Sequence, residues 1–276
     1  MARLGPRATT LHLWRMGILF LIGVFHQAYL WSGDILATYA VLGVLLLPFR
    51  RLATRTLARA SALALAAPTL GLAALMATGA GANARAAESV LAAGYPARQA
   101  LFAFAMFLLG LAAGRAGGEA GDPARAFERR LPALLGVGIV GSIAYVALVD
   151  LSGATVLSWT AVLAEALIAI AAPALALGYA ALLLRLLARP GWRRALAPLA
   201  AAGRLSLSNY LTQSLIGAFL LVRLGVIHPP LGIAISCAVF ALQVLVSRWW
   251  LAYFRFGPAE WLWRALSYGK LPPLRA

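Results

Sequence analysis

Long apolar runs separated by short polar stretches dominate the chain. Eight runs come close to the roughly 20 residues that a helix needs to cross a bilayer: 13–31, 33–49, 57–79, 97–114, 131–151, 157–187, 207–227 and 231–253. The pattern predicts an all-α, polytopic integral membrane helix bundle with about eight transmembrane helices. We expect residues 1–276 to form a single transmembrane domain that ends in a cytoplasmic tail, 254–276. Tryptophans and basic residues suit this tail to the membrane interface, either as an amphipathic segment or as a simple aromatic belt.

The basic residues predict the orientation of the bundle. If the eight runs cross the membrane in turn, 21 of the 24 Lys and Arg residues fall on one side, and only Arg85, Arg98 and Arg223 fall on the other. Cytoplasmic loops carry the excess of Lys and Arg, so we expect both termini in the cytoplasm. The same rule accounts for the net charge of +16 without nucleic acid as a partner.

Composition supports a membrane protein and excludes several kinds of site. The chain is 63% hydrophobic and 12% charged, with a mean hydropathy of +0.86, whereas soluble domains have about 25% charged residues. Cys237 is alone, and the three histidines are far apart, so no zinc cluster is expected. There is no glycine-rich phosphate loop. We therefore expect the lipid bilayer as a partner, and no metal or cofactor.

A polar stripe opens the seventh run. At 100° per residue, Ser206, Asn209, Tyr210 and Gln213 share one face of a helix. Lipid cannot satisfy these groups, so the face must meet protein or water. The stripe either lines a substrate pathway or bonds to neighbouring helices. Arg204, just before it, is either an anion contact at a helix N-terminus or a further cytoplasmic arginine.

Three ionisable residues fall in or beside the runs. His26 lies in the first run, and Asp34 follows eight residues later. A histidine near a carboxylate suits a general base, so His26 is the catalytic candidate and Asp34 its partner. The alternatives are a hydrogen bond to another helix for His26 and a helix cap for Asp34. Glu165 either takes part in proton-coupled chemistry, pairs with an Arg or His, or stays protonated in a structural role.

Position along the runs separates these candidates. His26 is expected toward the outer face of the membrane and the polar stripe toward the inner face. They should therefore not share one compact site unless a cavity spans the membrane. This separation favours a pathway lined by Asp34, Glu165, Arg204 and the stripe.

Three stretches together resemble a known family. The first is 31–51, with Gly33-Asp34-Ile35-Leu36 followed by Tyr39. The second is 203–214, with Gly203-Arg204-Leu205-Ser206 and Asn209-Tyr210. The third is 247–264, with Ser247-Arg248-Trp249-Trp250 and Phe256-Gly257-Pro258. This order resembles the YeiB-type family of bacterial inner-membrane proteins, catalogued as domain-of-unknown-function family 418.

The resemblance implies a multi-pass protein of the bacterial inner membrane that is distantly similar to acyltransferases of cell-envelope glycans. Its partners would then be an envelope glycan or lipid-linked substrate and an acyl donor. Family members usually begin with further spans, so the resemblance also implies a shortened chain. Two other hypotheses stay open: a transporter or exporter of a small molecule, coupled to protons through His26 or Glu165, and a structural protein without catalysis. The oligomeric state is not predicted.

Overall fold

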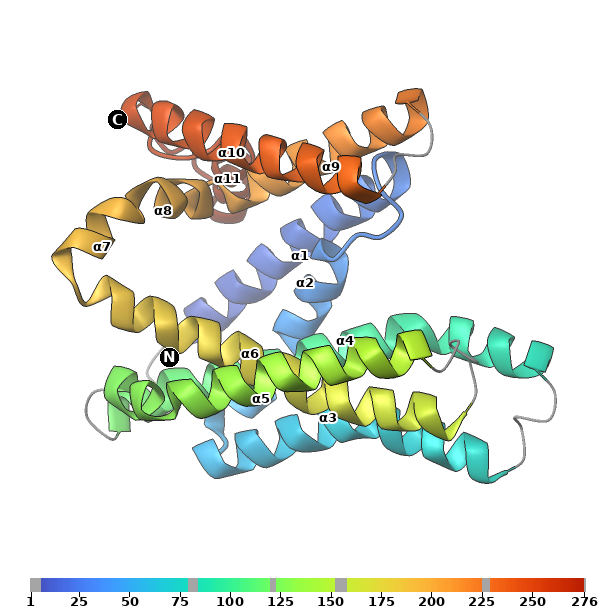
Figure 1. The fold of residues 1–276 in the computed structure, drawn as a ribbon. Helices are drawn as coiled ribbons and strands as arrows, with labels where there is room; N and C mark the ends of the chain where they lie inside the picture. The colour runs from blue at the N-terminus through green and yellow to red at the C-terminus, as the bar shows by residue number, and fades with distance from the viewer. Residues whose placement is uncertain (1–5, 79–83, 120–122, 152–157, 225–228, 276) are drawn as a thin grey trace. The chain divides into compact units, whose positions relative to one another are not determined.

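A computed structural model describes residues 6–78, 84–119, 123–151, 158–224 and 229–275 (Figure 1). The described residues are almost entirely helical, as the sequence predicts. Their helices are α1 (Pro6–Tyr29), α2 (Leu36–Leu45), the 3-10 helix η1 (Pro48–Arg51), α3 (Thr54–Ala77), α4 (Ala84–Glu119), α5 (Pro123–Leu151), α6 (Trp159–Leu187), α7 (Pro190–Ala195), α8 (Ala197–Arg204), α9 (Ser206–Leu224), α10 (Pro229–Tyr253) and α11 (Pro258–Tyr268).

Six stretches within the described residues are long and apolar enough to cross a membrane. They are Arg7–Tyr29, Thr54–Ala77, Ala93–Arg115, Arg129–Asp150, Trp159–Leu187 and Pro230–Tyr253. These stretches correspond to six of the eight expected runs, so the chain is a membrane protein by length and composition. The count of eight and the cytoplasmic location of both termini stay predictions.

The other two expected runs differ from full spans. Instead of filling 33–49, α2 has 10 residues and is about 15 Å long, half of the roughly 30 Å hydrocarbon core. It ends before Pro48, which lacks an N–H and disfavours helical backbone in the residue before it. The 19-residue α9 covers most of the seventh run, but five of its first eight residues are Ser, Asn, Thr or Gln, which lowers its mean hydropathy.

The described helices divide into two compact units, and the single transmembrane domain expected from the sequence stays a prediction. Unit 1 comprises Arg3–Val44 and Pro190–Ala276, and unit 2 comprises Leu45–Arg189. In unit 2, α3, α4, α5 and α6 pack side by side (Figure 1). Leu57, Leu108 and Ala112 form a buried cluster between α3 and α4, where the buried Ser61 hydroxyl donates to the Ala105 carbonyl at 2.9 Å.

Small residues bring α5 and α6 together. A Cβ added to Gly138 would lie 2.7 Å from backbone atoms of Leu175, and one added to Gly141 would lie 2.7 Å from the Ala171 Cβ. Close backbone approach through small residues is a common way for membrane helices to associate, because lipid tails are as apolar as the helices themselves.

In unit 1, the C-terminal tail forms a packed helix. The indole nitrogen of Trp14 on α1 donates to the Leu266 carbonyl of α11 at 3.0 Å, and that of Trp263 donates to the Arg15 carbonyl at 3.1 Å. The Arg15 guanidinium also lies 4.6 Å from the centre of the Trp263 ring. The segment that the sequence assigns to the membrane interface is thus fastened to α1 along one face.

Gly138→Ala should destabilise unit 2, because the new methyl group meets Leu175 backbone that cannot move aside cheaply. Overpacking of this kind costs about 1–3 kcal/mol. Thermal unfolding in detergent, followed by tryptophan fluorescence, should show a lower midpoint. Gly136→Ala is the control, because nothing lies within 4 Å of a Cβ at that position. Equal midpoints for the two variants would contradict this packing.

Candidate functional site

The carboxylate of Asp34 joins three helices of unit 1. Its Oδ1 lies 2.8 Å from Nδ1 of His26 on α1 and accepts a long hydrogen bond of 3.4 Å from the Tyr210 hydroxyl on α9. Its Oδ2 accepts from the Ala37 amide in the first turn of α2 at 2.8 Å. The carboxylate therefore caps α2 with one oxygen and faces His26 with the other; a catalytic role for the pair stays a prediction.

The His26–Asp34 pair is buried, and Asp34 faces one of the two ring nitrogens. The side chains of His26 and Asp34 are 1% and 0% exposed. Nδ1 lies 2.8 Å from the carboxylate oxygen, but among the described residues neither Nδ1 nor Nε2 has a hydrogen-bond partner in favourable geometry. The Tyr210 ring lies 5.0 Å from the imidazole, tilted by 40°. A buried polar atom without a partner is costly, and the carboxylate oxygen of Asp34 faces Nδ1 rather than Nε2.

Gly23 makes the approach of α1 to Asp34 feasible. A Cβ at this position would lie 2.3 Å from the Ala37 amide nitrogen and 2.8 Å from Oδ2 of Asp34. Only glycine leaves room for the start of α2 here. Sequence reasoning did not single out Gly23, although it lies three residues before His26 and hence on the same face of α1.

Gly23→Ala should push α2 away from α1 and separate Asp34 from His26. We expect loss of stability of about 1–3 kcal/mol, measured as a lower thermal midpoint in detergent. Gly17→Ala on the same helix is the matched control, because a Cβ there meets nothing within 4 Å. A Gly23→Ala protein as stable as the Gly17→Ala protein would show that the helices do not approach this closely.

The expected separation between His26 and the polar stripe is wrong for Tyr210. Its hydroxyl reaches Asp34 and its ring lies beside His26. The charge pattern places the starts of α1 and α9 at the same membrane surface. Because the short helices α7 and α8 lead into α9, position along a run does not give the place of a residue in the packed helices.

The rest of the stripe bonds mainly to α10. The Asn209 amide donates to the Ser247 hydroxyl at 3.1 Å, and Gln213 donates to the Gln243 side chain at 2.6 Å. Gln243 in turn donates to the Asn209 carbonyl at 2.9 Å. These contacts join two helices, which is the second of the roles that the sequence left open. A pathway lined by Asn209 and Gln213 stays a prediction.

Ser206 of the stripe and Arg204 before it lie where α8 ends and α9 begins. Ser206 is exposed. Arg204 is exposed too and donates to the Arg255 carbonyl at 3.2 Å, which fastens the end of α8 to the chain before α11. This contact is with a backbone carbonyl; an anion contact at Arg204 stays a prediction.

Glu260 on α11 is a site residue that sequence reasoning missed. Its Oε1 accepts from the amides of Leu207 and Ser208 at 2.7 and 3.0 Å, and its Oε2 accepts from the Ser208 hydroxyl at 2.5 Å. A carboxylate at a helix N-terminus satisfies free amides and complements the helix dipole. Glu260 therefore fixes the start of α9, and with it the position of Tyr210. The only feature of the sequence that pointed to Glu260 was its charge, because it is the last acidic residue of the chain.

Glu260→Ala should destabilise the start of α9, because two amides and a hydroxyl lose their acceptor at a buried position. Each orphaned group costs about 1–3 kcal/mol. Glu260→Gln is the matched variant. The side-chain oxygen of the glutamine still accepts from the backbone amides of Leu207 and Ser208, so the thermal midpoint should fall less than in Glu260→Ala. The thermal midpoints should fall in the order wild type, Gln, Ala. Midpoints that coincide for all three proteins would show that the cap contributes nothing.

Glu165 belongs to unit 2 and has a partner there. Its Oε2 lies 3.6 Å from Nη2 of Arg98, with the two side chains 20% and 39% exposed. Of the roles left open by sequence, pairing with an arginine is the one that this contact matches. Asp34, His26 and Tyr210 thus form one cluster in unit 1, and Glu165 forms a separate pair in unit 2.

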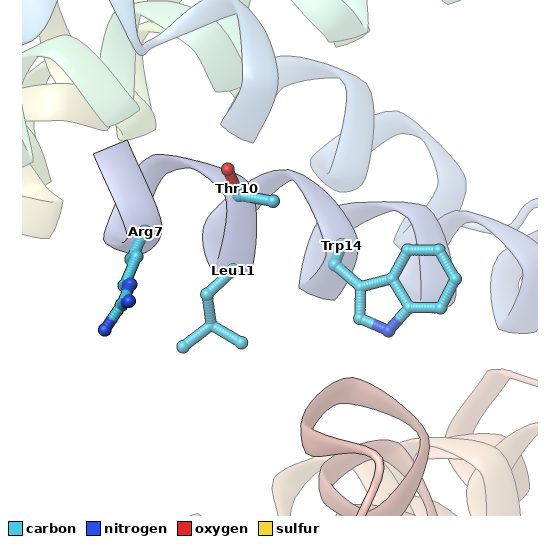
Figure 2. A pocket seen from close by; sticks show the side chains of 4 residues that line it. All are labelled: Arg7, Thr10, Leu11 and Trp14. Carbon is cyan, nitrogen blue, oxygen red and sulfur yellow. The ribbon is translucent and has the colours of Figure 1, made fainter. Parts of the chain in front are cut away.

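A shallow hollow of about 420 Å³ lies at the start of α1. It is lined by Arg7, Thr10, Leu11 and Trp14, and Figure 2 shows Arg7, Leu11 and Trp14 projecting from the same side of the helix while Thr10 points away. Arginine and tryptophan at the end of a span are typical of the membrane interface. The described residues contain no group of three His, Cys, Asp or Glu placed to hold a metal ion.

Comparison with known proteins identifies relatives of uncharacterised function. The family described as "Protein of unknown function (DUF418)" matches residues 113–270. The uncharacterized protein YxaH of Bacillus subtilis is 29% identical, over 98% of this chain and 75% of its own length. YeiB of Escherichia coli is 37% identical over 40% of this chain and 29% of its own, and an uncharacterized 39.9 kDa protein of Bacillus acidopullulyticus is 36% identical over 37% and 30%. No solved structure matches.

Proposed function

We propose that this chain, which belongs to the DUF418 family, is an acyltransferase-like enzyme of the bacterial inner membrane that modifies an envelope glycan or a lipid-linked acceptor. The observation that carries the proposal is the buried His26–Asp34 pair with Nε2 of His26 left without a partner. A histidine held by a carboxylate on one nitrogen, with its other nitrogen free, is the arrangement that general-base catalysis requires.

The reaction uses these groups in sequence. Nε2 of His26 takes the proton of an acceptor hydroxyl, whose oxygen forms a bond to the carbonyl carbon of the acyl donor. The bond from that carbon to the leaving group of the donor then breaks, and the leaving group receives the proton from Nε2. Asp34 orients the ring and stabilises its positive charge between the two transfers, and Tyr210 donates to Asp34 and steadies it.

The second candidate is a transporter or exporter of a small molecule. The same observation favours it in part, because a buried histidine paired with a carboxylate is also able to load and release a proton. The two functions differ in outcome: the enzyme leaves a new covalent product in the envelope, whereas the transporter changes only where a solute accumulates.

His26→Gln should abolish the envelope modification while leaving the protein folded. General-base catalysis contributes about 10²–10⁴-fold, so the acylated product should fall at least about 100-fold. Mass spectrometry of envelope glycans and lipids measures it in a deletion strain that carries either the wild-type or the variant gene.

His12→Gln is the matched control for this experiment. His12 also lies on α1 and contacts α2, with its Nε2 3.0 Å from the Gly43 carbonyl oxygen, but it has no carboxylate partner there. The His12→Gln variant should therefore keep the wild-type amount of acylated product. The proposal fails if both variants keep the product, or if no acylated component distinguishes the wild type from the deletion strain.

A further inference from the structure

A small cavity in unit 2 contains both charges of an ion pair. Its volume is about 210 Å³, and its lining consists of Arg98 and Glu165 together with small or apolar residues: Pro68, Gly71, Leu72, Leu75 and Gly94. A Cβ on Gly71 or Gly94 would meet nothing within 4 Å. These two glycines therefore widen the cavity, unlike Gly138, which brings two backbones together.

The ion pair inside this cavity is loose. Nη2 of Arg98 lies 3.6 Å from Oε2 of Glu165, whereas charge-assisted hydrogen bonds are about 2.7–2.9 Å long. A guanidinium has five N–H donors, and a carboxylate accepts about four hydrogen bonds. In the part of the chain that the structure describes, no hydrogen bond occupies them. The pair thus leaves donors and acceptors of opposite charge open to a ligand.

The cavity lies near one end of three helices. Leu75 near the end of α3, Gly94 near the start of the apolar part of α4 and Glu165 in α6 line the same cavity. Glu165 is about 9 Å along α6 from Trp159. This depth corresponds to the boundary between lipid headgroups and acyl chains.

Two exposed aromatic residues support a position of the cavity at the level of the lipid headgroups. Tyr95 and Trp159 are 53% and 62% exposed, one turn before Arg98 and under two turns before Glu165 respectively. Tyrosine and tryptophan concentrate where a membrane meets water. The charges therefore lie where a headgroup reaches them, and Leu72 and Leu75 lie where the first carbons of an acyl chain follow.

We propose that this cavity binds the headgroup of a phospholipid that carries both a phosphate and a primary ammonium group. The phosphate lies against the Arg98 guanidinium, whose fork of N–H groups suits phosphate oxygens. The ammonium donates to Glu165. The occupant is a membrane lipid rather than a free phosphate compound, because the cavity is walled by apolar side chains at headgroup depth.

The presence of both charges in one cavity determines the selectivity. A headgroup with a phosphate but no amine places its net negative charge near Glu165, which repels it. A headgroup with a trimethylated ammonium carries the right charge but has no N–H to donate to the carboxylate. Arg98 thus supplies affinity for phosphate, and Glu165 supplies preference for the primary amine.

Lipid retention by the full chain tests this site. The purified protein is reconstituted in nanodiscs that contain equal parts of phosphatidylethanolamine, phosphatidylglycerol and phosphatidylcholine, and the lipids that stay bound after extraction into detergent are counted by native mass spectrometry. The wild type should retain phosphatidylethanolamine about three- to fivefold over each of the others, as expected for a partly exposed charge contact. Glu165→Gln should lose this preference, and Arg98→Gln should lose retention of all three.

Two controls make the outcome decisive. Arg129→Gln removes an exposed arginine of α5 outside the cavity and should keep the wild-type preference. Soluble phosphoethanolamine, added during extraction, should not displace the retained lipid. Equal retention of the three lipids by the wild type, an unchanged preference in Glu165→Gln, or displacement by soluble phosphoethanolamine would each overturn the proposal.

Discussion

The buried carboxylate of Asp34 is the contact on which unit 1 depends. A charge inside an apolar helix bundle is costly unless it is paired and hydrogen-bonded, and Asp34 meets this requirement with groups from α1, α2 and α9. Helices as short as α2 are unstable alone, so its place on α1 depends on that cap, on the space that Gly23 leaves and on the His12 contact with Gly43. The same carboxylate faces the His26 ring. Asp34 therefore both stabilises the packing of the helices and orients the proposed base.

Two other acidic side chains, Glu260 and Glu165, are also paired or hydrogen-bonded, but with different partners. Glu260 is satisfied by backbone amides at the start of α9, and Glu165 by an arginine at a longer distance. Of the eight acidic residues in the chain, these three have distinct surroundings. Asp34 faces a histidine with a free nitrogen, which suits proton transfer, whereas the loose pair at Glu165 suits binding of a ligand with two charges.

The sequence predicted most of the helices, because a membrane helix needs a long apolar run and these runs are unmistakable. It also left a helix cap open as one role of Asp34, and it predicted that Asn209 and Gln213 would face protein or water. It did not reveal that α2 ends before Pro48 as a short helix, or which side chains of α10 meet the stripe. The contact between Tyr210 and His26 depends on how α1 and α9 cross, and the cap by Glu260 joins residues more than 50 positions apart. Such pairings arise from packing, which a periodic pattern does not encode.

The central claim is that Nε2 of His26 is a free proton acceptor because Asp34 holds the other nitrogen. Solid-state nitrogen NMR of histidine-labelled protein in bilayers tests it directly, with the His26 signals assigned by their loss in His26→Gln. The account predicts a neutral ring with its proton on Nδ1 and a bare Nε2, and it predicts that Asp34→Asn removes this preference. A proton found on Nε2 in the wild-type protein would contradict it.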